Sequence, residues 1–303
     1  QMSGAMCFNV STSGDPHSLR VTDVIRSMAN VVTIDKRILS HCITDSHLFV
    51  VTDDSVFVLR LDALRDTPLT ASLDISSPDL FRFKPDSEAT VTVEGIAIDQ
   101  VRCKNPVPSS SNVMLTSTHS RVFLVDQRGD ESQKMYCIFD ESSRFRRDGA
   151  TMMQLQLPEE MGRITRVEGG ADHIVALTET GRVWAMGTGS HGELGVGGVH
   201  SSPQEFLECD LPDDVIVEDI ANGSWHSVAI TDSKDVYVWG WNREGQLGED
   251  QEKCVYSPMP LDVDDVISID AKECTTVLTT RDDTGHARTI TYGSQLIRED
   301  NDD

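Results

Sequence analysis

Two stretches in the second half of the chain align with each other without a gap, and this repeat restricts the possible folds more than any other feature. They are residues 163–195 (RITRVEGGADHIVALTETGRVWAMGTGSHGELG) and residues 216–248 (IVEDIANGSWHSVAITDSKDVYVWGWNREGQLG). Equivalent positions include His173 and His226, Trp184 and Tyr237, Gly187 and Gly240, and Gly195 and Gly248. Such a repeat is typical of folds in which one small unit is copied and the copies pack against each other.

Further copies flank this pair. A third copy begins near Asp265 and ends at Gly293 without the histidine, and two weaker copies lie at residues 47–61 and 112–126. Each copy holds short runs rich in Val, Ile, Thr and aromatic residues, and Gly, Asp and Ser separate these runs. This pattern predicts strands joined by tight turns.

Each clear copy contains three strands, and a fourth fits in the stretch that follows each G-x-L-G ending. Four-stranded units repeated about an axis are the blades of a β-propeller, an all-β fold that protects its strand edges by radial closure. We therefore expect one propeller domain over residues 1–303, with clear repeats at 163–295, weak repeats at 36–150 and at least five blades. An acidic tail follows at residues 298–303.

The second clear copy also carries a family motif. Its residues 223–248, GSWHSVAITDSKDVYVWGWNREGQLG, resemble the regulator-of-chromosome-condensation repeat. The resemblance implies a propeller that usually has seven blades, whereas this chain length allows five to six units. Residues 7–14 (CFNVSTSG) look like the end of a repeat, so we expect the N-terminal strand to join the C-terminal blade and close the ring. The alternative is a fragment that lacks a blade.

Residues that recur at the same phase are expected to serve the blade itself. His173 and His226 recur in this way, and no second histidine or carboxylate completes a metal ligand set beside them. We interpret both as structural residues that bond a neighbouring turn, and we expect no metal and no cofactor. The glycines predicted to occupy turn positions are Gly187, Gly195, Gly240 and Gly248.

Residues found in only one copy need another explanation. Trp225 stands where the neighbouring copies have Asp172 and about Cys274, and Trp241 also has no aromatic counterpart. Because Trp dominates interaction hot spots, these positions predict a partner surface. Its members are Trp225, Trp241, Arg243, Glu244 and His191. The alternative for Trp225 is a purely structural role between two blades.

The charge indicates which partners the surface favours. The formal net charge is −24, and residues 201–303 hold 24 acidic against 7 basic residues. Such a surface repels phosphate, so we expect no direct binding of nucleic acid and a preference for basic protein segments. One basic island, formed by Arg144, Arg146 and Arg147, is a second candidate partner site or else a solvated loop.

Several protein classes are disfavoured by the sequence. It contains no phosphate-binding glycine loop, no zinc-protease motif and no nucleophile elbow, so we predict that the chain is not an enzyme. No apolar run is long enough to cross a membrane. The seven cysteines form no C-x-x-C pair, which favours a reduced compartment. We expect a monomer in the nucleus or the cytoplasm.

These observations predict a protein-interaction scaffold. The family resemblance implies a chromatin-linked role, with a Jumonji-type oxygenase or another histone-modifying enzyme, or basic histone tails, as the partner. Two alternatives stay open. One is guanine nucleotide exchange on a small GTPase, although the well-matched copies contain no obvious wedge-like insert. The other is a substrate-recognition propeller within a larger ligase or trafficking protein.

Overall fold

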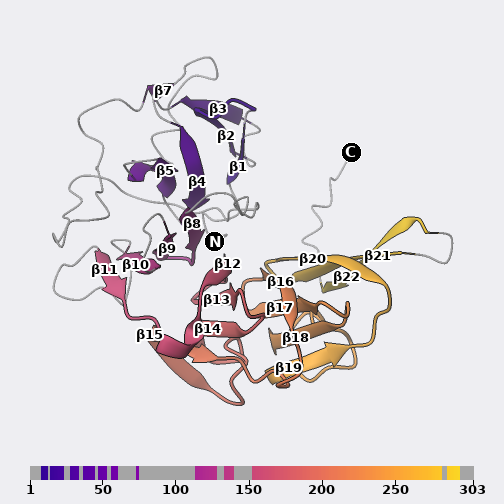
Figure 1. Ribbon diagram of the computed structural model, residues 1–303. Helices are drawn as coiled ribbons and strands as arrows, with labels where there is room; N and C mark the ends of the chain where they lie inside the picture. Colours follow the sequence, from indigo (N-terminus) through magenta and orange to yellow (C-terminus); the bar gives the residue numbers. More distant parts are fainter. Residues whose placement is uncertain are drawn as a thin grey trace. The chain divides into compact units, whose positions relative to one another are not determined.

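The computed structural model describes residues 8–12, 14–23, 28–33, 37–44, 47–52, 56–60, 73–74, 113–127, 133–139, 152–281 and 285–293 (Figure 1). Within them, the only helical element is the 3₁₀ turn η2 (Glu159–Met161), and nearly everything else regular is strand. No helix among the described residues is long and apolar enough to span a membrane. The chain divides into an N-terminal unit, Gln1–Gln156, and a C-terminal unit, Leu157–Asp303.

The described residues of the N-terminal unit form three sheets. The first joins β1 (Phe8–Thr12), β2 (Ser18–Asp23), β3 (Met28–Thr33) and β7 (Leu73–Asp74), in that order. The second joins β4 (Ile38–Ile43), β5 (His47–Thr52) and β6 (Val56–Arg60). The third joins β11 (Met152–Leu155), β10 (Lys134–Phe139), β9 (Arg121–Asp126) and β8 (Val113–Ser117). Both predicted weak repeats thus form hairpins, β5–β6 and β8–β9.

The described residues of the C-terminal unit form three further sheets, which are called here its first, second and third sheets. The first consists of β12 (Ile164–Gly169), β13 (His173–Thr178), β14 (Val183–Gly189) and β15 (His200–Glu208). The second consists of β16 (Val217–Asn222), β17 (His226–Thr231), β18 (Val236–Trp241) and β19 (Cys254–Leu261). The third consists of β20 (Val266–Lys272), β21 (Thr275–Arg281) and β22 (Ala287–Gly293). The predicted fourth strand is present in the first two sheets.

Strand register agrees with the repeat alignment. His173 pairs with Gly187 in the first sheet, and His226 pairs with Gly240 in the second. In the third sheet, Gly293 pairs with Thr275, which therefore stands at the histidine position. Each first strand also carries a one-residue bulge near its start, and β4 of the N-terminal unit has the same bulge. Because a bulge is a local feature of a strand pair, its recurrence marks these sheets as copies.

The core of the C-terminal unit lies between its sheets. Strands β13 and β17 are buried along their whole length, and apolar side chains from all three sheets form one cluster. Trp239 is completely buried in this cluster, and its indole N–H donates to the backbone oxygen of Glu193 at 3.1 Å. The second sheet is therefore joined to the first through both packing and a hydrogen bond.

The N-terminal strand differs from expectation. We expected residues 7–14 to complete the C-terminal blade, but β1 pairs along its whole length with β2 in an antiparallel hairpin. The described pairings of β20, β21 and β22 include no strand from the N-terminal end. The turn explains the difference, because the Asp15 carboxylate accepts hydrogen bonds from the His17 N–H and the Ser18 hydroxyl at 3.0 and 2.9 Å. A local turn of this kind costs little loop-closure entropy.

A buried histidine predicts acid sensitivity in the N-terminal unit. Burial lowers the pKa of His41 to about 4, below the unfolded value near 6.5. The unfolded chain therefore takes up this proton first as the pH falls, and the free energy of unfolding decreases between the two values. We expect it to be about 2 kcal/mol lower at about pH 5 than at about pH 8, and the His41→Gln variant should lose this component. Urea unfolding of both proteins at both pH values checks this, and equal pH dependence would contradict it.

Candidate protein-binding site

Backbone hydrogen bonds hold three equivalent loops side by side in the C-terminal unit. These loops, called the connecting loops, join the first and second strands of each sheet at residues 170–172, 223–225 and 273–274. The Ala171 N–H donates to the Ser224 oxygen, and the Ser224 N–H donates to the Glu273 oxygen, both at 2.7 Å. The three loops thus form one continuous hydrogen-bonded row at the same end of their sheets.

The recurrent histidines pack against the glycines at the start of these loops. His173 and His226 are fully buried. The Nε2 atom of His173 lies 3.3 Å from the Ser227 hydroxyl, and Nε2 of His226 lies 2.9 Å from the Thr276 hydroxyl. Each imidazole therefore contacts the second strand of the next sheet, which adds a contact between sheets to the predicted structural role.

Two glycines that the sequence analysis did not single out make room for these rings. A Cβ atom on Gly170 would lie 2.0 Å from Cε1 of His173, and one on Gly223 would lie 1.9 Å from Cε1 of His226. In the third sheet, Lys272 stands at the glycine position and Thr275 at the histidine position. The glycine and the histidine are thus lost together. The shared G-x-x-H spacing was the signal that would have identified them.

A third histidine of the same phase lies in the N-terminal unit. His47 begins β5 and pairs with Arg60, as His173 pairs with Gly187. Its backbone oxygen accepts from the Thr44 N–H, as the His173 oxygen accepts from Gly170. The side chain is buried. The weaker upstream copy therefore retains the histidine position, which the sequence analysis did not recognise.

The four predicted turn glycines all have positive φ. The φ angles of Gly187 and Gly240 are 127° and 107°, and a Cβ at these positions would lie 2.3 Å from the Asp172 oxygen and 2.5 Å from the Trp225 oxygen. A side chain is therefore excluded both by conformation and by the close approach of the connecting loop. Gly195 and Gly248 also have positive φ angles, of 67° and 101°, but their nearest neighbours are the side chains of Trp239 and Leu261.

The structure brings five of the eight predicted partner residues together around Trp241. The His191 and Trp241 rings stack with centroids 4.5 Å apart, and the Trp225 ring lies edge-on to Trp241 at 6.4 Å. The Arg243 guanidinium lies 5.5 Å from the centre of the Trp241 ring and pairs with the Glu244 carboxylate at 3.1 Å. Both indoles are partly exposed. These five residues form what is called here the aromatic cluster.

Buried polar groups fix the cluster in place. The Glu193 side chain is fully buried and accepts from the His191 backbone N–H at 2.7 Å, and one carboxylate oxygen lies 3.2 Å from His191 Nδ1. In the second sheet, the Gln246 amide oxygen accepts from the Glu244 N–H in the equivalent position. The Trp241 backbone N–H donates to the Trp225 backbone oxygen at 2.7 Å. Hydrogen bonds therefore fix the backbone that carries the two indoles.

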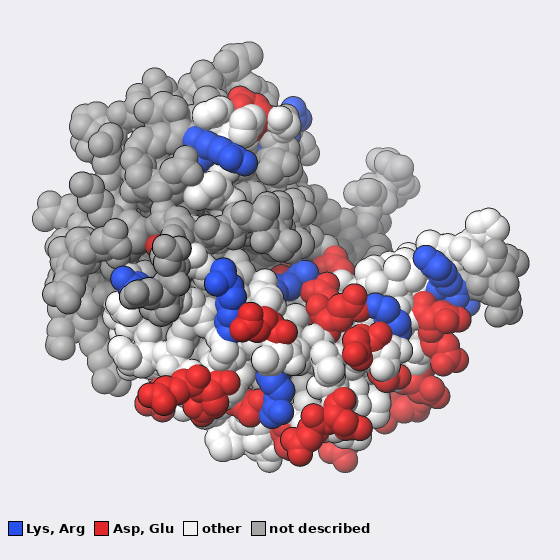
Figure 2. Space-filling view, in the orientation of Figure 1, with Lys and Arg blue, Asp and Glu red and all other residues white. Residues whose placement is uncertain are grey.

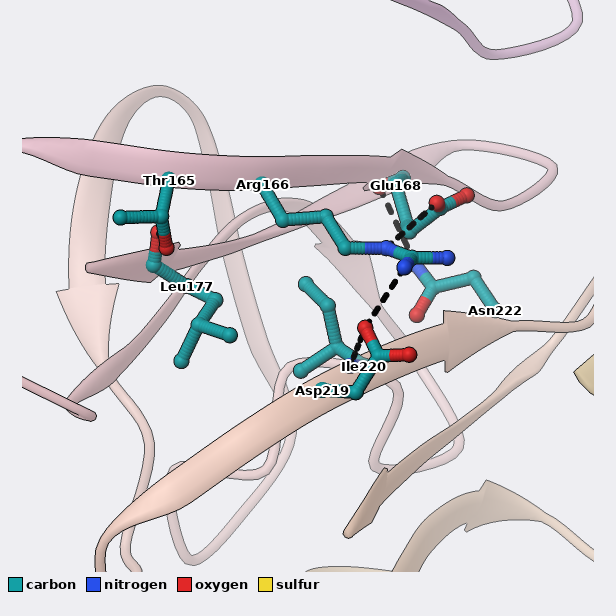
Figure 3. A network of polar contacts seen from close by, with 7 residues as sticks. All are labelled: Thr165, Arg166, Glu168, Leu177, Asp219, Ile220 and Asn222. Carbon is teal, nitrogen blue, oxygen red and sulfur yellow. Dashed lines mark hydrogen bonds and ion pairs between the residues drawn. The ribbon is translucent and has the colours of Figure 1, made fainter. Parts of the chain in front are cut away.

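Charged groups also connect the first strands of adjacent sheets (Figure 3). Arg166 on β12 pairs with Glu168 at 3.0 Å and with Asp219 on β16 at 2.6 Å. Burial raises the pKa of the Glu168 carboxyl, the Arg166 charge opposes this shift, and the Asp219 and Asp270 carboxylates add to it. The Asn222 amide donates to the Glu168 backbone oxygen at 3.3 Å. These bonds connect neighbouring strands, and the Arg166 guanidinium is shared between two carboxylates.

Acidic side chains outnumber basic ones on the visible surface of the C-terminal unit. Figure 2 shows Asp and Glu in several patches over this unit, with Lys and Arg in smaller numbers between them. No group of three or more potential metal ligands occurs among the described residues. The basic island of Arg144, Arg146 and Arg147 and the tail at 298–303 lie outside the described residues.

Comparison with known families identifies the repeat. The profile described as the regulator of chromosome condensation (RCC1) repeat matches residues 164–193 and 217–246, and a second profile of that description matches residues 180–230 and 235–271. The predicted family resemblance is confirmed by these matches.

Similar curated proteins share only this part of the chain. RCC1 domain-containing protein 1 of Homo sapiens is 36% identical over 85 residues, which are 28% of this chain and 22% of that protein. The serine/threonine-protein kinase Nek9 of Xenopus laevis is 37% identical over 103 residues, which are 33% of this chain and 11% of the kinase. The matched stretch therefore spans less than a quarter of either relative.

Solved structures resemble a larger part of the chain. Prp20p of Saccharomyces cerevisiae matches with a TM-score of 0.64 at 15% identity, over 93% of this chain and 69% of Prp20p. Human WBSCR16 matches with a TM-score of 0.59 at 15% identity, over 86% of this chain and 64% of that protein. These likenesses confirm the predicted all-β propeller fold.

Proposed function

Because residues 164–271 carry regulator of chromosome condensation (RCC1) repeats, we propose that this chain is a protein-binding scaffold that holds a partner at the loops of its propeller. The repeat occurs in relatives as different as a kinase and a ubiquitin ligase, so the chemistry of a whole relative does not follow from it. The absence of catalysis in this chain is part of the proposal.

The aromatic cluster is the observation that carries this function. The repeat requires no aromatic residue at the positions of Trp225 and Trp241, yet both indoles meet on one side of the unit and stay partly exposed. Partly exposed tryptophans on ordered loops are the usual anchors of a protein interface, because they offer a large contact area and lose little conformational entropy on binding.

Charge favours a basic partner. The net charge of −24 attracts positively charged segments and repels phosphate groups. The structure of Prp20p is described together with binding of that protein to Gsp1p and histones. We propose that this chain associates with chromatin in the nucleus and binds basic histone segments or a histone-modifying enzyme. A Jumonji-type oxygenase is the form of this partner that the family resemblance implies.

Removing the indoles is expected to abolish partner capture. In affinity purification with the whole chain as bait, Trp225→Ala and Trp241→Ala should each reduce the yield of a specific partner about tenfold or more, because each variant removes an anchor from the interface. Met259→Ala is the matched control, since Met259 is an exposed apolar residue on β19 outside the cluster. Quantitative mass spectrometry of the captured proteins measures the effect.

Partner capture is read together with the stability of each variant. Thermal unfolding of each variant establishes that the propeller is intact, so a lost partner reflects a lost contact. If both tryptophan variants retain every partner that the wild type and Met259→Ala capture, the aromatic cluster is not the binding site, and the proposed function loses its main support.

A further inference from the structure

One half of the aromatic cluster already holds an arginine. The Arg243 guanidinium lies 5.5 Å from the centre of the Trp241 ring, and its Nε atom pairs with the Glu244 carboxylate at 3.1 Å. An indole below the cation and a carboxylate beside it is an arrangement that suits a planar guanidinium, which stacks on aromatic rings and forms paired hydrogen bonds with carboxylates. The protein thus supplies its own example of an arginine site.

Beside the Trp225 half of the cluster, the neighbouring connecting loop carries an acidic residue, Glu273. Trp225 is partly exposed, and the connecting loop that carries it is hydrogen-bonded to the next loop through the Ser224 N–H and the Glu273 oxygen at 2.7 Å. Among the described residues, the Glu273 carboxylate takes part in no ion pair. An indole and an acidic residue therefore occupy neighbouring loops, whereas Trp241 ends β18 and Glu244 follows it three residues later.

The backbone at Glu273 is unusual. Its φ angle is 51°, in the left-handed region that a residue with a Cβ rarely adopts. A glycine would adopt this conformation without cost, yet the sequence places a carboxylate here. The Glu273 backbone oxygen accepts from the Ser224 backbone N–H, and this bond holds the loop of Glu273 against the loop of Trp225.

We propose that Trp225 and Glu273 form a binding site for an arginine side chain of an extended basic segment in a partner protein. The proposal deepens the function proposed above and rests on it. The guanidinium stacks on the Trp225 indole and pairs with the Glu273 carboxylate, and the acidic surface of the C-terminal unit attracts the rest of the segment. Lysine fits less well, because its ammonium is more strongly hydrated and makes no planar stack.

Peptide binding to the full chain tests this site. The probe is a fluorescein-labelled Gly-Ser peptide with arginine at alternate positions, and two matched peptides carry lysine or the neutral isostere citrulline at those positions. Fluorescence anisotropy at low salt gives the dissociation constants. We expect the citrulline peptide to bind about tenfold more weakly than the arginine peptide, and the lysine peptide to fall between them.

Variants of the chain locate the site. Trp225→Ala should weaken binding of the arginine peptide about tenfold, whereas Trp225→Phe, which retains an aromatic face, should retain most of the affinity. Glu273→Gln should weaken it about threefold. Asp213→Asn removes the same charge from the opposite end of β16, since Asp213 precedes the strand and Trp225 follows it. This control should bind the peptide as the wild type does.

The outcomes separate this proposal from the previous one. Equal binding of the arginine and citrulline peptides, equal binding of arginine and lysine peptides, or wild-type binding by Trp225→Ala would each overturn the arginine site. If that happens while Trp225→Ala still loses its captured partner, the scaffold function stands and only the arginine recognition fails. If the arginine peptide binds as expected but partner capture does not depend on Trp225, the arginine site stands and the proposal that Trp225 anchors the captured partner fails.

Discussion

The Trp239→Ala variant is expected to unfold with a free energy about 4 kcal/mol lower than that of the wild type, the largest loss we predict for a single side chain. Trp239 is completely buried, donates to the Glu193 oxygen and packs so closely on Gly195 that a Cβ there would lie 2.9 Å from the indole. Alanine would leave a cavity between two sheets and an unsatisfied buried carbonyl. The first and second sheets of the C-terminal unit would both lose packing contacts.

Urea unfolding followed by far-UV circular dichroism measures this loss. Tyr237→Ala is the matched control, because Tyr237 lies two residues away on the same strand and is only partly buried. We expect its loss to be less than half as large. A loss below about 1.5 kcal/mol for Trp239→Ala would show that the neighbouring side chains refill the space, and the account of this core would then be wrong.

The Gly223→Ala variant is expected to lose about 3 kcal/mol, although it adds only one methyl group. That group would lie 1.9 Å from the His226 ring and 2.8 Å from the Glu273 oxygen, so the ring and the adjacent loop must both move. Gly223 is not among the positive-φ glycines, and the cost therefore comes from contact and not from the backbone conformation. Gly198→Ala is the matched control, because its nearest neighbour would lie at an ordinary 3.5 Å.

The third sheet indicates how to rescue this variant. There, Thr275 replaces the histidine and Lys272 replaces the glycine. If the His226 ring is what excludes a side chain at position 223, then His226→Thr combined with Gly223→Ala should be less destabilising than the sum of the two single changes. Chemical denaturation of the four proteins gives this coupling directly. Strictly additive losses would mean that the ring is not the obstacle.

The sequence predicted the strands and their register well because both depend on local chemistry. Alternating apolar residues and short polar turns identify hairpins, and the aligned histidines and glycines fix which residues pair, as His226 with Gly240. The same comparison separated Trp225 and Trp241, which the repeat does not need, from His173, which it does. The structure then brought both tryptophans and His191 into one cluster.

The pairing partner of the N-terminal strand could not be predicted in this way. Residues 7–14 looked like a repeat ending, and the repeat alone gives no reason to prefer a nearby partner strand over a distant one. The turn at Asp15 decides the matter, since a hairpin closed by a few residues costs far less chain entropy than pairing with the other end of the chain. The sequence of a strand indicates which of its faces is buried, but it does not indicate which other strand pairs with it.

By itself, therefore, the sequence determined a repeated all-β unit, the hairpin pairings within the repeats and four of the positions at which only glycine fits. The tertiary structure alone decided which groups meet between sheets: His226 with Thr276, Trp239 with Glu193, and His191 with Trp241. The physical reason is that hairpin hydrogen bonds join residues close in the chain and leave a periodic signature. Contacts between sheets join residues about fifty positions apart and depend on how whole sheets pack, which no local pattern records.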